Sequence, residues 1–498
     1  MLAEWVIAAK RSAMRRLLPL LLILALALVP TACKPRPEGT VKVVVVGDEP
    51  RLRDPALGPL PQSDAVLIQN VAQGLVRFDA AGNVVPGLAE RWNVSDDGLS
   101  YIFRISSMNW PDGQKITAQQ VARLLKRQLA DRSRNPLKDS VGAIGDVVAM
   151  TDRVIEIQLV APRPNLLALL AQPEFGILRG NSGTGPFMPV RSGGPGGALR
   201  LSRAVTSGDD EEPEHDEVML AGASAENAIR DFAAAKTDLV LGGTFADLPL
   251  ARAIKLQRNS LRFDPASGLF GLIPTRRGGP LDKADVRRLL TQALDRANFV
   301  AMLGVPGLDP RATLLEPGLD GISPAIAPAW SGTPLGSRLP TLRAQADRLF
   351  GRDRPVIHVA LPDRPGADLL FQELQRDWGA IGLTVERAKG GDDDFTLIDE
   401  VAPSSSPAWF VRRFRCETVP ICDPQADQLM EAARQSPVPA QRYALLVQAA
   451  GLIDDGQLFI PIAAPVRWSL VSVRIQNFAG NRYARHTLTD LEQQPGRD

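Results

Sequence analysis

The sequence is poor in the residues that most often build metal and nucleophile sites. Among its 498 residues are only 3 cysteines and 3 histidines, and the histidines lie far apart at His215, His358 and His486. This scatter offers no metal-ligand or catalytic-triad spacing. The sequence also contains no Gly-x-Ser-x-Gly elbow and no Ser-x-x-Lys pair. We therefore expect a protein that is not an enzyme and that carries no metal or cofactor.

Aromatic residues and excess charge are also scarce. With 3 tyrosines and 7 tryptophans the chain has few aromatic platforms, which excludes sugar stacking over a wide surface. A formal net charge of +1 argues against a broad basic face, so we expect no nucleic-acid partner. The hydrophobic fraction of 45% and the charged fraction of 23% are typical of a soluble globular protein, and the length suits two or three domains.

Residues 1–32 have the pattern of an export signal rather than of a folded domain. The apolar run Leu17–Val29 follows four basic residues, and two small residues precede Cys33. The pattern resembles a bacterial lipoprotein signal, which implies that Cys33 becomes the lipid-modified first residue of the mature protein. Pro30 departs from that pattern, because an aliphatic residue is preferred at its position; secretion with Cys33 unmodified is the alternative. Met14 is an alternative start.

The chain after the signal differs from it in charge and hydropathy. Removing four basic residues and Glu4 changes the formal net charge from +1 to −2. No later apolar run approaches the roughly 20 residues needed to span a bilayer. Cys416 and Cys422 remain in a compartment that permits disulfides. A disulfide between them, two free thiols and half of a metal site are the three alternatives, and the lack of a nearby histidine disfavours the metal site.

The stretch from Gly74 to Gln128 has the most regular pattern of the chain. A short strand, a turn and an apolar patch around Trp92 lead into a strand at Ser100–Ile105, whose apolar residues share one face. After the turn at residues 110–113, Thr117 and Gln120 form a capping box at the start of a helix with an apolar stripe.

This order of residues resembles the signature of the family 5 extracellular solute-binding proteins, the peptide- and nickel-type receptors of ABC importers. The matching residues are Gly74-Leu75-Val76, Pro86, Leu88-Ala89, Trp92, Ser95, Asp97-Gly98, Tyr101, Phe103-Arg104, Trp110-Pro111-Asp112-Gly113, Thr117-Ala118 and Val121. Two later strings, 183–187 and 285–296, resemble further motifs of the same family. The family's Asn-Pro…Tyr-Trp and Phe-Asn segments have no counterpart here.

The resemblance implies a bilobal α/β fold of the periplasmic-binding-protein type (class II, cluster C), with mixed sheets in each lobe and an extra inserted domain. It implies the signal peptide 1–32, a discontinuous domain I (33–60, 180–268 and 466–498), an inserted domain II (61–179) and a domain III (269–465) that forms the second lobe.

Hydrophobic patterning predicts the remaining elements. Strands are expected at Val41–Val46, Val154–Leu159, Asp238–Leu241, Val356–Ala360, Leu383–Glu386, Phe395–Ile398 and Leu458–Ile462, with further strands in the tail Trp468–Phe478. Helices are expected at Asp64–Ala72, Asn165–Leu170, Ala223–Ala235, Leu281–Gly304, Leu342–Phe350, Ala367–Ile381 and Ala440–Ile453. Arg191–Gly197 is expected to be a Gly-rich loop and Ser207–Glu217 a solvated acidic loop.

Two segments supply the expected ligand-binding residues. In the resembling family the loop after the first strand lines the ligand cleft, which here points to Asp48 and Glu49. Peptide-binding relatives hold the ligand's amino terminus with an acidic residue in a segment of the third domain. The corresponding stretch, residues 403–410, contains no aspartate; its candidates are Trp409, Phe410, Arg412 and Arg413.

Each of these candidates has a second interpretation. Arginines in a cleft wall would favour a carboxylate or phosphate on the ligand. Facing solvent, or paired with an acid such as Glu400, they would bind no ligand. Trp409 could contact the ligand or pack in the core.

The function implied by the resemblance is that of a receptor which captures an oligopeptide or similar small solute by hinge closure. Its partners would be the permease and ATPase subunits of an ABC importer, with the membrane reached through lipid on Cys33. We expect a monomeric, lipid-anchored periplasmic protein. The alternative is a non-transport binding or sensor module on the same fold.

Overall fold

The computed structural model describes residues 39–190, 198–205, 214–323, 325–489 and 491–493. Residues 40–492 form one unit by their contacts. The expected loop Arg191–Gly197, the signal peptide and Cys33 lie outside the described residues. In the part of the chain that is described, no helix combines the length and the apolar character needed to cross a membrane.

A seven-stranded sheet contains the first strand of the unit. Its strand order is β10-β11-β12-β1-β13-β20-β14, and β1 pairs in parallel with both β12 and β13 while the other pairs are antiparallel. The strands are β1 (Val41–Val46), β10 (Met188–Val190), β11 (Leu199–Val205), β12 (Glu214–Ala223), β13 (Leu239–Thr244), β14 (Leu261–Phe263) and β20 (Arg467–Val471). Two helices cover it: α2 (Gln62–Val71), which packs on β1, and α5 (Ala225–Ala233), which packs on β1 and β13.

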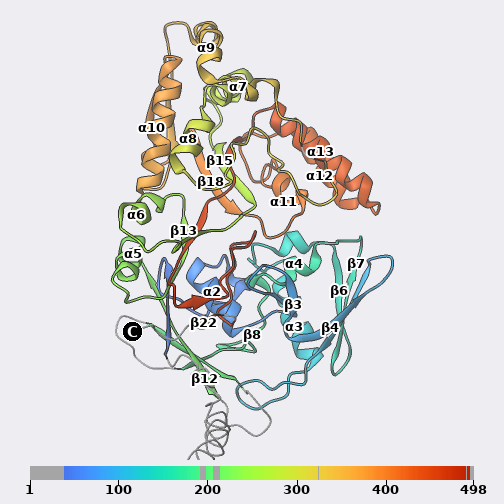
Figure 1. Ribbon diagram of the computed structural model, residues 1–498. Helices are drawn as coiled ribbons and strands as arrows, with labels where there is room; N and C mark the ends of the chain where they lie inside the picture. Colours follow the sequence, from blue (N-terminus) through green and yellow to red (C-terminus); the bar gives the residue numbers. More distant parts are fainter. Residues whose placement is uncertain (1–38, 191–197, 206–213, 324, 490, 494–498) are drawn as a thin grey trace, which may run out of the picture. The chain divides into compact units, whose positions relative to one another are not determined.

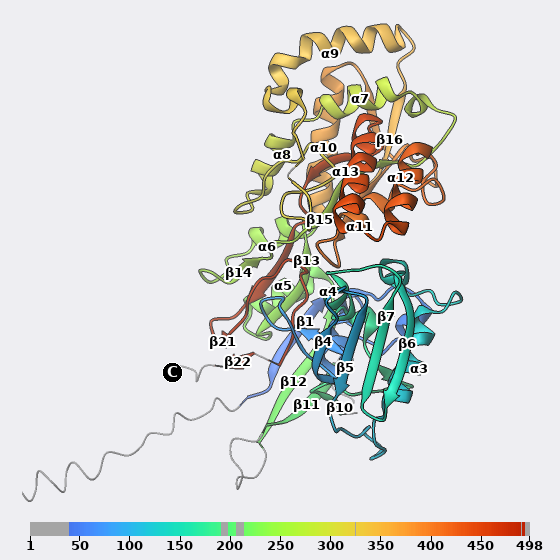
Figure 2. The same ribbon diagram turned by 90° about the vertical axis from the view of Figure 1, so that its right-hand side faces the viewer.

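A four-stranded antiparallel sheet is built from one continuous part of the chain. Its order is β4-β5-β7-β6, formed by β4 (Ala89–Val94), β5 (Ser100–Ile105), β6 (Ile144–Thr151) and β7 (Val154–Leu159). Helix α3 (Ala118–Leu129) packs on β6, as Figure 2 shows. Thr117 and Gln120 form the predicted capping box at its N-terminus. The buried faces of the sheet and of α3 share one hydrophobic core.

A five-stranded sheet brings together distant parts of the sequence. Its order is β17-β16-β18-β15-β19, formed by β15 (Gly268–Pro274), β16 (Val356–Ala360), β17 (Thr384–Arg387), β18 (Phe395–Val401) and β19 (Ile460–Ala463). β16 and β17 are parallel and joined by α10 (Pro365–Ala380), which confirms the expected β-α-β unit. α7 (Ala284–Gln292), α8 (Arg296–Leu303) and α9 (Leu335–Phe350) share a core with α10 and this sheet.

A second core lies beside β15 and β18. It is formed by residues of α11 (Pro407–Arg412), α12 (Pro424–Gln435) and α13 (Pro439–Asp455). Figure 1 shows α12 and α13 side by side. The remaining short elements are β2 (Val76–Phe78), β3 (Val84–Pro86), β8 (Leu178–Arg179), β9 (Ser182–Gly183), β21 (Ile475–Gln476), β22 (Glu492–Gln493), α4 (Leu166–Leu170) and α6 (Leu248–Ala253).

The chain passes twice between the seven-stranded and five-stranded sheets. The first crossing joins β14 to β15 through residues 264–267, and the second joins β19 to β20 through residues 464–466. The Asp264 amide donates to the carbonyl of Arg467, 3.0 Å away, so the first crossing is hydrogen-bonded to the residue of β20 that directly follows the second. The Arg467 guanidinium also pairs with Asp399 of β18 at 2.7 Å. Two short connections of this kind can act as a hinge.

Several expected elements differ from the structure. Leu281–Gly304 is two helices, α7 and α8, because the side chain of Asp295 caps α8 by accepting a hydrogen bond from the Asn298 amide at 3.1 Å. Residues 214–217 of the expected acidic loop belong to β12, where Glu217 pairs with Arg200 of β11. Helix α9 begins at Leu335, before the expected start at Leu342. Its first turns are mostly exposed, so no apolar stripe in the sequence marks them.

Candidate functional site

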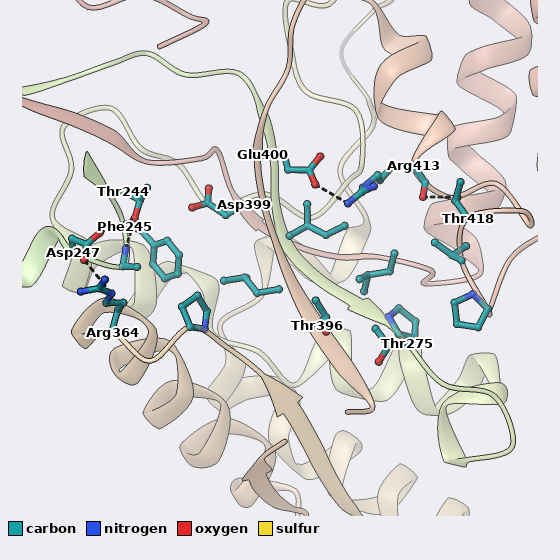
Figure 3. Close-up of a pocket in the computed structure, with 18 residues that line it drawn as sticks. Thr244, Phe245, Asp247, Thr275, Arg364, Thr396, Asp399, Glu400, Arg413 and Thr418 are labelled. Carbon is teal, nitrogen blue, oxygen red and sulfur yellow. Dashed lines mark hydrogen bonds and ion pairs between the residues drawn. The ribbon is translucent and has the colours of Figure 1, made fainter. Parts of the chain in front are cut away.

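A pocket of about 630 Å³ lies where the loop after β13 meets the end of β18 (Figure 3). This volume is in the range of small-molecule sites. The residues that line it are Thr244, Phe245, Ala246, Asp247, Ile273, Pro274, Thr275, Pro362, Arg364, Thr396, Leu397, Ile398, Asp399, Glu400, Arg413, Thr418, Val419 and Pro420. The walls therefore come from both sheets, and a solute in the pocket would touch segments on each side of the two crossings.

Two close backbone approaches fix one wall of the pocket. Gly243 lies directly under the indole of Trp468, and a Cβ there would be 2.2 Å from the ring. The Trp468 Nε1–H donates to the carbonyl of Thr244 at 2.7 Å, which holds the end of β13. The Gly366 amide donates to the carbonyl of Ala246 at 2.7 Å, and a Cβ on Gly366 would lie 2.0 Å from the neighbouring carbonyl oxygen. The start of α10 is thus seated on the loop after β13.

Asp247 and Arg364 face each other across that contact. Asp247 is only 6% exposed, and its Oδ1 lies 3.8 Å from Arg364 Nε. Its Oδ2 accepts a hydrogen bond of 3.4 Å from Thr244 Oγ1. Burial raises the pKa of Asp247, and Glu226 adds to the rise while Arg364 opposes it. Arg364 is shared, because its Nη1 also donates to Glu226 at 3.2 Å.

The opposite wall carries two acidic residues that have arginine partners. Asp399 pairs with Arg467 at 2.7 Å, and both side chains are mostly buried. Burial raises the pKa of Asp399, and the pairing with Arg467 opposes the rise. Glu400 pairs with Arg413 at 2.6 Å, with both side chains nearly half exposed. Figure 3 shows this pair beside the pocket and away from Asp247.

The structure brings only one of the six predicted ligand-binding residues to this pocket. Arg413 lines it and is paired with Glu400, as the second interpretation of the arginines holds. Asp48 and Glu49 are exposed in the loop after β1 and do not line the pocket. The other three lie in or beside α11.

These three residues make other contacts. Phe410 is fully buried in the core of the α11–α13 region, and Trp409 packs edge-on against it with ring centroids 5.0 Å apart. Arg412 Nη1 donates to the carbonyl of Asp139 at 2.6 Å, and burial lowers its pKa. In this conformation the segment after β18 serves packing and contacts with residues 139–172.

Sequence reasoning missed Asp247, Arg364 and Asp399. One feature could have pointed to Asp247: it follows the predicted strand Asp238–Leu241. That strand belongs to β13, which pairs in parallel with β1, and ligands commonly bind beyond the carboxyl ends of parallel strands. Arg364 and Asp399 come from segments whose proximity to Asp247 depends on long-range pairing.

Cysteine and metal chemistry add little to the site. Cys416 and Cys422 form a disulfide with Cα atoms 5.1 Å apart, beside the pocket residues 418–420. Within the described ranges, no group of three or more histidine, cysteine, aspartate or glutamate side chains is arranged to hold a metal ion.

Residues 83–401 match the family described as "Bacterial extracellular solute-binding proteins, family 5 Middle". The chain belongs to this family. The match covers the four-stranded sheet and runs to the end of β18, so it includes most of the pocket-lining residues. The family resemblance stated from the signature stretch is thereby confirmed.

Proteins of known sequence or structure are similar to this chain over most of its length. The chain is 25% identical to a probable di/tripeptide-binding protein 5 of Pseudomonas aeruginosa, over 83% of this chain and 88% of that protein. The structure resembles the murein tripeptide binding protein MppA of Escherichia coli, with a TM-score of 0.78 and 17% identity over 92% of this chain and 99% of that chain. It also resembles Haemophilus influenzae OppA in complex with RPPGFSPFR, with a TM-score of 0.77 and 15% identity over 92% of this chain and 100% of that chain. The bilobal α/β fold expected for the solute-binding protein is confirmed.

Proposed function

We propose that this solute-binding protein is the extracytoplasmic receptor of an ABC importer and that it captures a peptide or a similar small solute without altering it. The observation that carries the proposal is the pocket, whose walls come from segments on both sides of the two chain crossings. The names of the similar proteins, which bind di-, tri- or oligopeptides, support the choice of solute.

The contacts of the structure support capture by closure. The segment after β18 touches residues of the 61–179 region through polar groups: Gln172 Nε2 donates to the carbonyl of Pro403 at 2.8 Å, and Asn165 Nδ2 donates to Ser404 Oγ at 2.9 Å. Such hydrogen bonds can form and break at low cost, because water replaces them when the surfaces part. A solute that touches both pocket walls would favour the closed arrangement.

The finer assignments belong to the same proposal. We infer three domains (33–60 with 180–268 and 466–498; 61–179; 269–465), each with one of the three larger sheets. We also infer export through residues 1–32, a lipid anchor on Cys33, a monomeric state and a permease with its ATPase as partners. The chemistry of the pocket favours binding over catalysis, since each of its three acidic residues has an arginine within 4 Å and its lining contains no serine, cysteine, histidine or lysine.

The test is calorimetric titration of the purified mature protein, refolded to remove bound solute, with alanine peptides of two to five residues. We expect one site with a Kd of about 1 μM or lower for at least one length. Thr418→Trp places a large side chain at an exposed position of the pocket and should abolish that binding. Thr151→Trp, at an exposed position of β6, is the matched control and should bind as the wild type does. Equal binding by both variants would exclude this pocket, and no binding of any peptide would overturn the choice of solute.

A further inference from the structure

One carboxylate oxygen in the pocket lacks a hydrogen-bond partner. Asp247 Oδ1 is buried and accepts no hydrogen bond, and the residue as a whole is only 6% exposed. A buried carboxylate oxygen without a donor is costly, and native structures seldom keep one unless a water, a ligand or an ion completes it. Asp247 also stands at the N-cap of α6 but makes no side-chain cap bond there. Its unused oxygen therefore has no local structural role.

The neighbouring guanidinium does not fully satisfy this oxygen. Arg364 Nε lies 3.8 Å away, beyond hydrogen-bond distance. The same guanidinium hydrogen-bonds to Glu226 at 3.2 Å, so a single positive charge serves two carboxylates. This end of the pocket therefore carries one negative charge in excess.

The other acidic residues of the pocket do not share this excess. Asp399 has Arg467 at 2.7 Å, and Glu400 has Arg413 at 2.6 Å, each with a partner that it shares with no other acidic residue of the pocket wall. The imbalance of charge is thus local to Asp247. Asp247 is itself one of the residues that line the pocket.

We propose that Asp247 binds a primary ammonium group of the captured solute, and that this contact makes the pocket selective for ligands with a free amine. An ammonium has three N–H donors and one positive charge, which match an unpartnered carboxylate oxygen and the excess charge beside Arg364. The α-ammonium of a peptide and the ammonium of a lysine side chain offer the same chemistry. The inference rests on the proposed function, since it assumes that peptides enter this pocket.

Three peptides separate the two sources of the ammonium group. Ala-Ala-Ala carries an α-ammonium; propionyl-Ala-Ala lacks only that amino group; propionyl-Lys-Ala carries a side-chain ammonium alone. We expect the wild type to bind at least one of the two amine-bearing peptides about tenfold or more tightly than propionyl-Ala-Ala, as a charge-assisted hydrogen bond predicts. Whichever amine-bearing peptide shows the gain identifies the source.

The decisive variant is Asp247→Asn, which keeps the size of the side chain and removes its charge. We expect it to bind the amine-bearing and amine-free peptides with equal affinity, and to bind propionyl-Ala-Ala as the wild type does. That last result also shows that the pocket is still folded. The matched control, Asp231→Asn in α5, changes an aspartate outside the pocket whose side chain is 45% exposed, and should keep the preference.

Two results would overturn the inference. A wild type that binds all three peptides equally, or an Asp247→Asn variant that keeps the tenfold preference, would contradict it while leaving peptide capture intact. If the wild type bound none of these three peptides and none of the alanine peptides of two to five residues, the proposed function would fail, and the inference with it. The two failures are therefore distinguishable.

Discussion

The four-stranded and five-stranded sheets are specified by the sequence in different ways. In the first, all strands lie between Ala89 and Leu159, and neighbours in the sheet are mostly neighbours in the chain. In the second, Gly268 pairs with Val401 and Leu272 pairs with Ile460. The first can be anticipated from turns and alternating side chains. The second forms only when segments distant in sequence pair, and this sheet together with the segments around it supplies most of the pocket.

Trp378 provides the strongest test of this difference between the two sheets. It is fully buried in α10, its Nε1–H donates to the carbonyl of Leu290 at 3.0 Å, and its ring lies 5.7 Å from that of Phe395. It therefore joins three segments that are far apart in sequence. Trp378→Ala should lower the free energy of unfolding by about 3–5 kcal/mol, because it leaves a cavity and an unpaired carbonyl. Urea unfolding would measure the loss in free energy of unfolding, and hydrogen exchange would show which region loses protection.

Trp110 is the matched site in the four-stranded region, where it is 1% exposed. Trp110→Ala should reduce exchange protection in β4–β7 and α3 while the amides of β15–β19 stay protected. Trp378→Ala should do the reverse. If each substitution weakened both regions equally, the two sheets would unfold as one cooperative unit and the contrast would not describe their stability.

Arg467 gives the next largest expected effect. Its guanidinium pairs with Asp399 where the chain crosses between sheets, and both side chains are mostly buried. Arg467→Met should destabilise the protein by about 3 kcal/mol, since it leaves a buried carboxylate without a partner. The double variant Arg467→Met/Asp399→Leu should recover much of that loss, and thermal unfolding at constant pH would compare them. If the double variant were as unstable as the single one, packing at the crossing rather than the unpaired charge would be responsible.

Much of the fold could be predicted because local signals agree with it. The strands at Val41–Val46, Ser100–Ile105 and Val154–Leu159 have the expected bounds, since alternation or a continuous apolar run marks them and turns bound them. The break in Leu281–Gly304 was missed because the apolar spacing continues through it, and only the Asp295 cap reveals the new helix.

The candidate site could be predicted far less well. The signature stretch identifies the family but contributes no pocket-lining residue. Arg413 was named from the resemblance, because it follows the stretch that corresponds to the ligand-binding segment of peptide-binding relatives. Asp247 and Arg364 meet through the approach of Gly366 to the carbonyl of Ala246. No local pattern encodes that approach. Binding chemistry here depends on long-range contacts that a motif does not record.

Asp454, in α13 beside the five-stranded sheet, predicts how the stability of this region depends on pH. Burial raises its pKa to about 7; Asp455 adds to the rise, and the hydrogen bond from the Leu314 amide opposes it. The unfolded group titrates near 3.8, so between about pH 4 and pH 7 the folded state holds a proton that the unfolded state lacks. Stability from this group is thus present at low pH and lost as pH rises.

Asp454→Asn should remove that loss, because the amide cannot ionise and its oxygen can still accept from Leu314. The expected result is a gain of about 2–4 kcal/mol relative to the wild type at pH 8 and little difference at pH 4, since the stability tied to a pKa raised from 3.8 to about 7 is lost by pH 8. Urea unfolding across this range would measure it. Parallel stability curves for the two proteins would show that Asp454 titrates normally in the folded state.

Thr117 tests the locally specified region and should give the smallest effect. Its hydroxyl accepts from the Gln120 amide at 3.3 Å, and the Gln120 side chain accepts from the Thr117 amide, so two N–H groups at the start of α3 are satisfied within four residues. Thr117→Ala should cost about 1 kcal/mol, as for other N-caps, while Thr117→Ser should cost only a few tenths. Because α3 packs on β6, the loss should appear as reduced exchange protection in the four-stranded region and leave peptide binding unchanged. A change in affinity with Thr117→Ala would mean that the two regions are coupled through the contacts between residues 139–172 and 403–412, and that the pocket depends on the local motif after all.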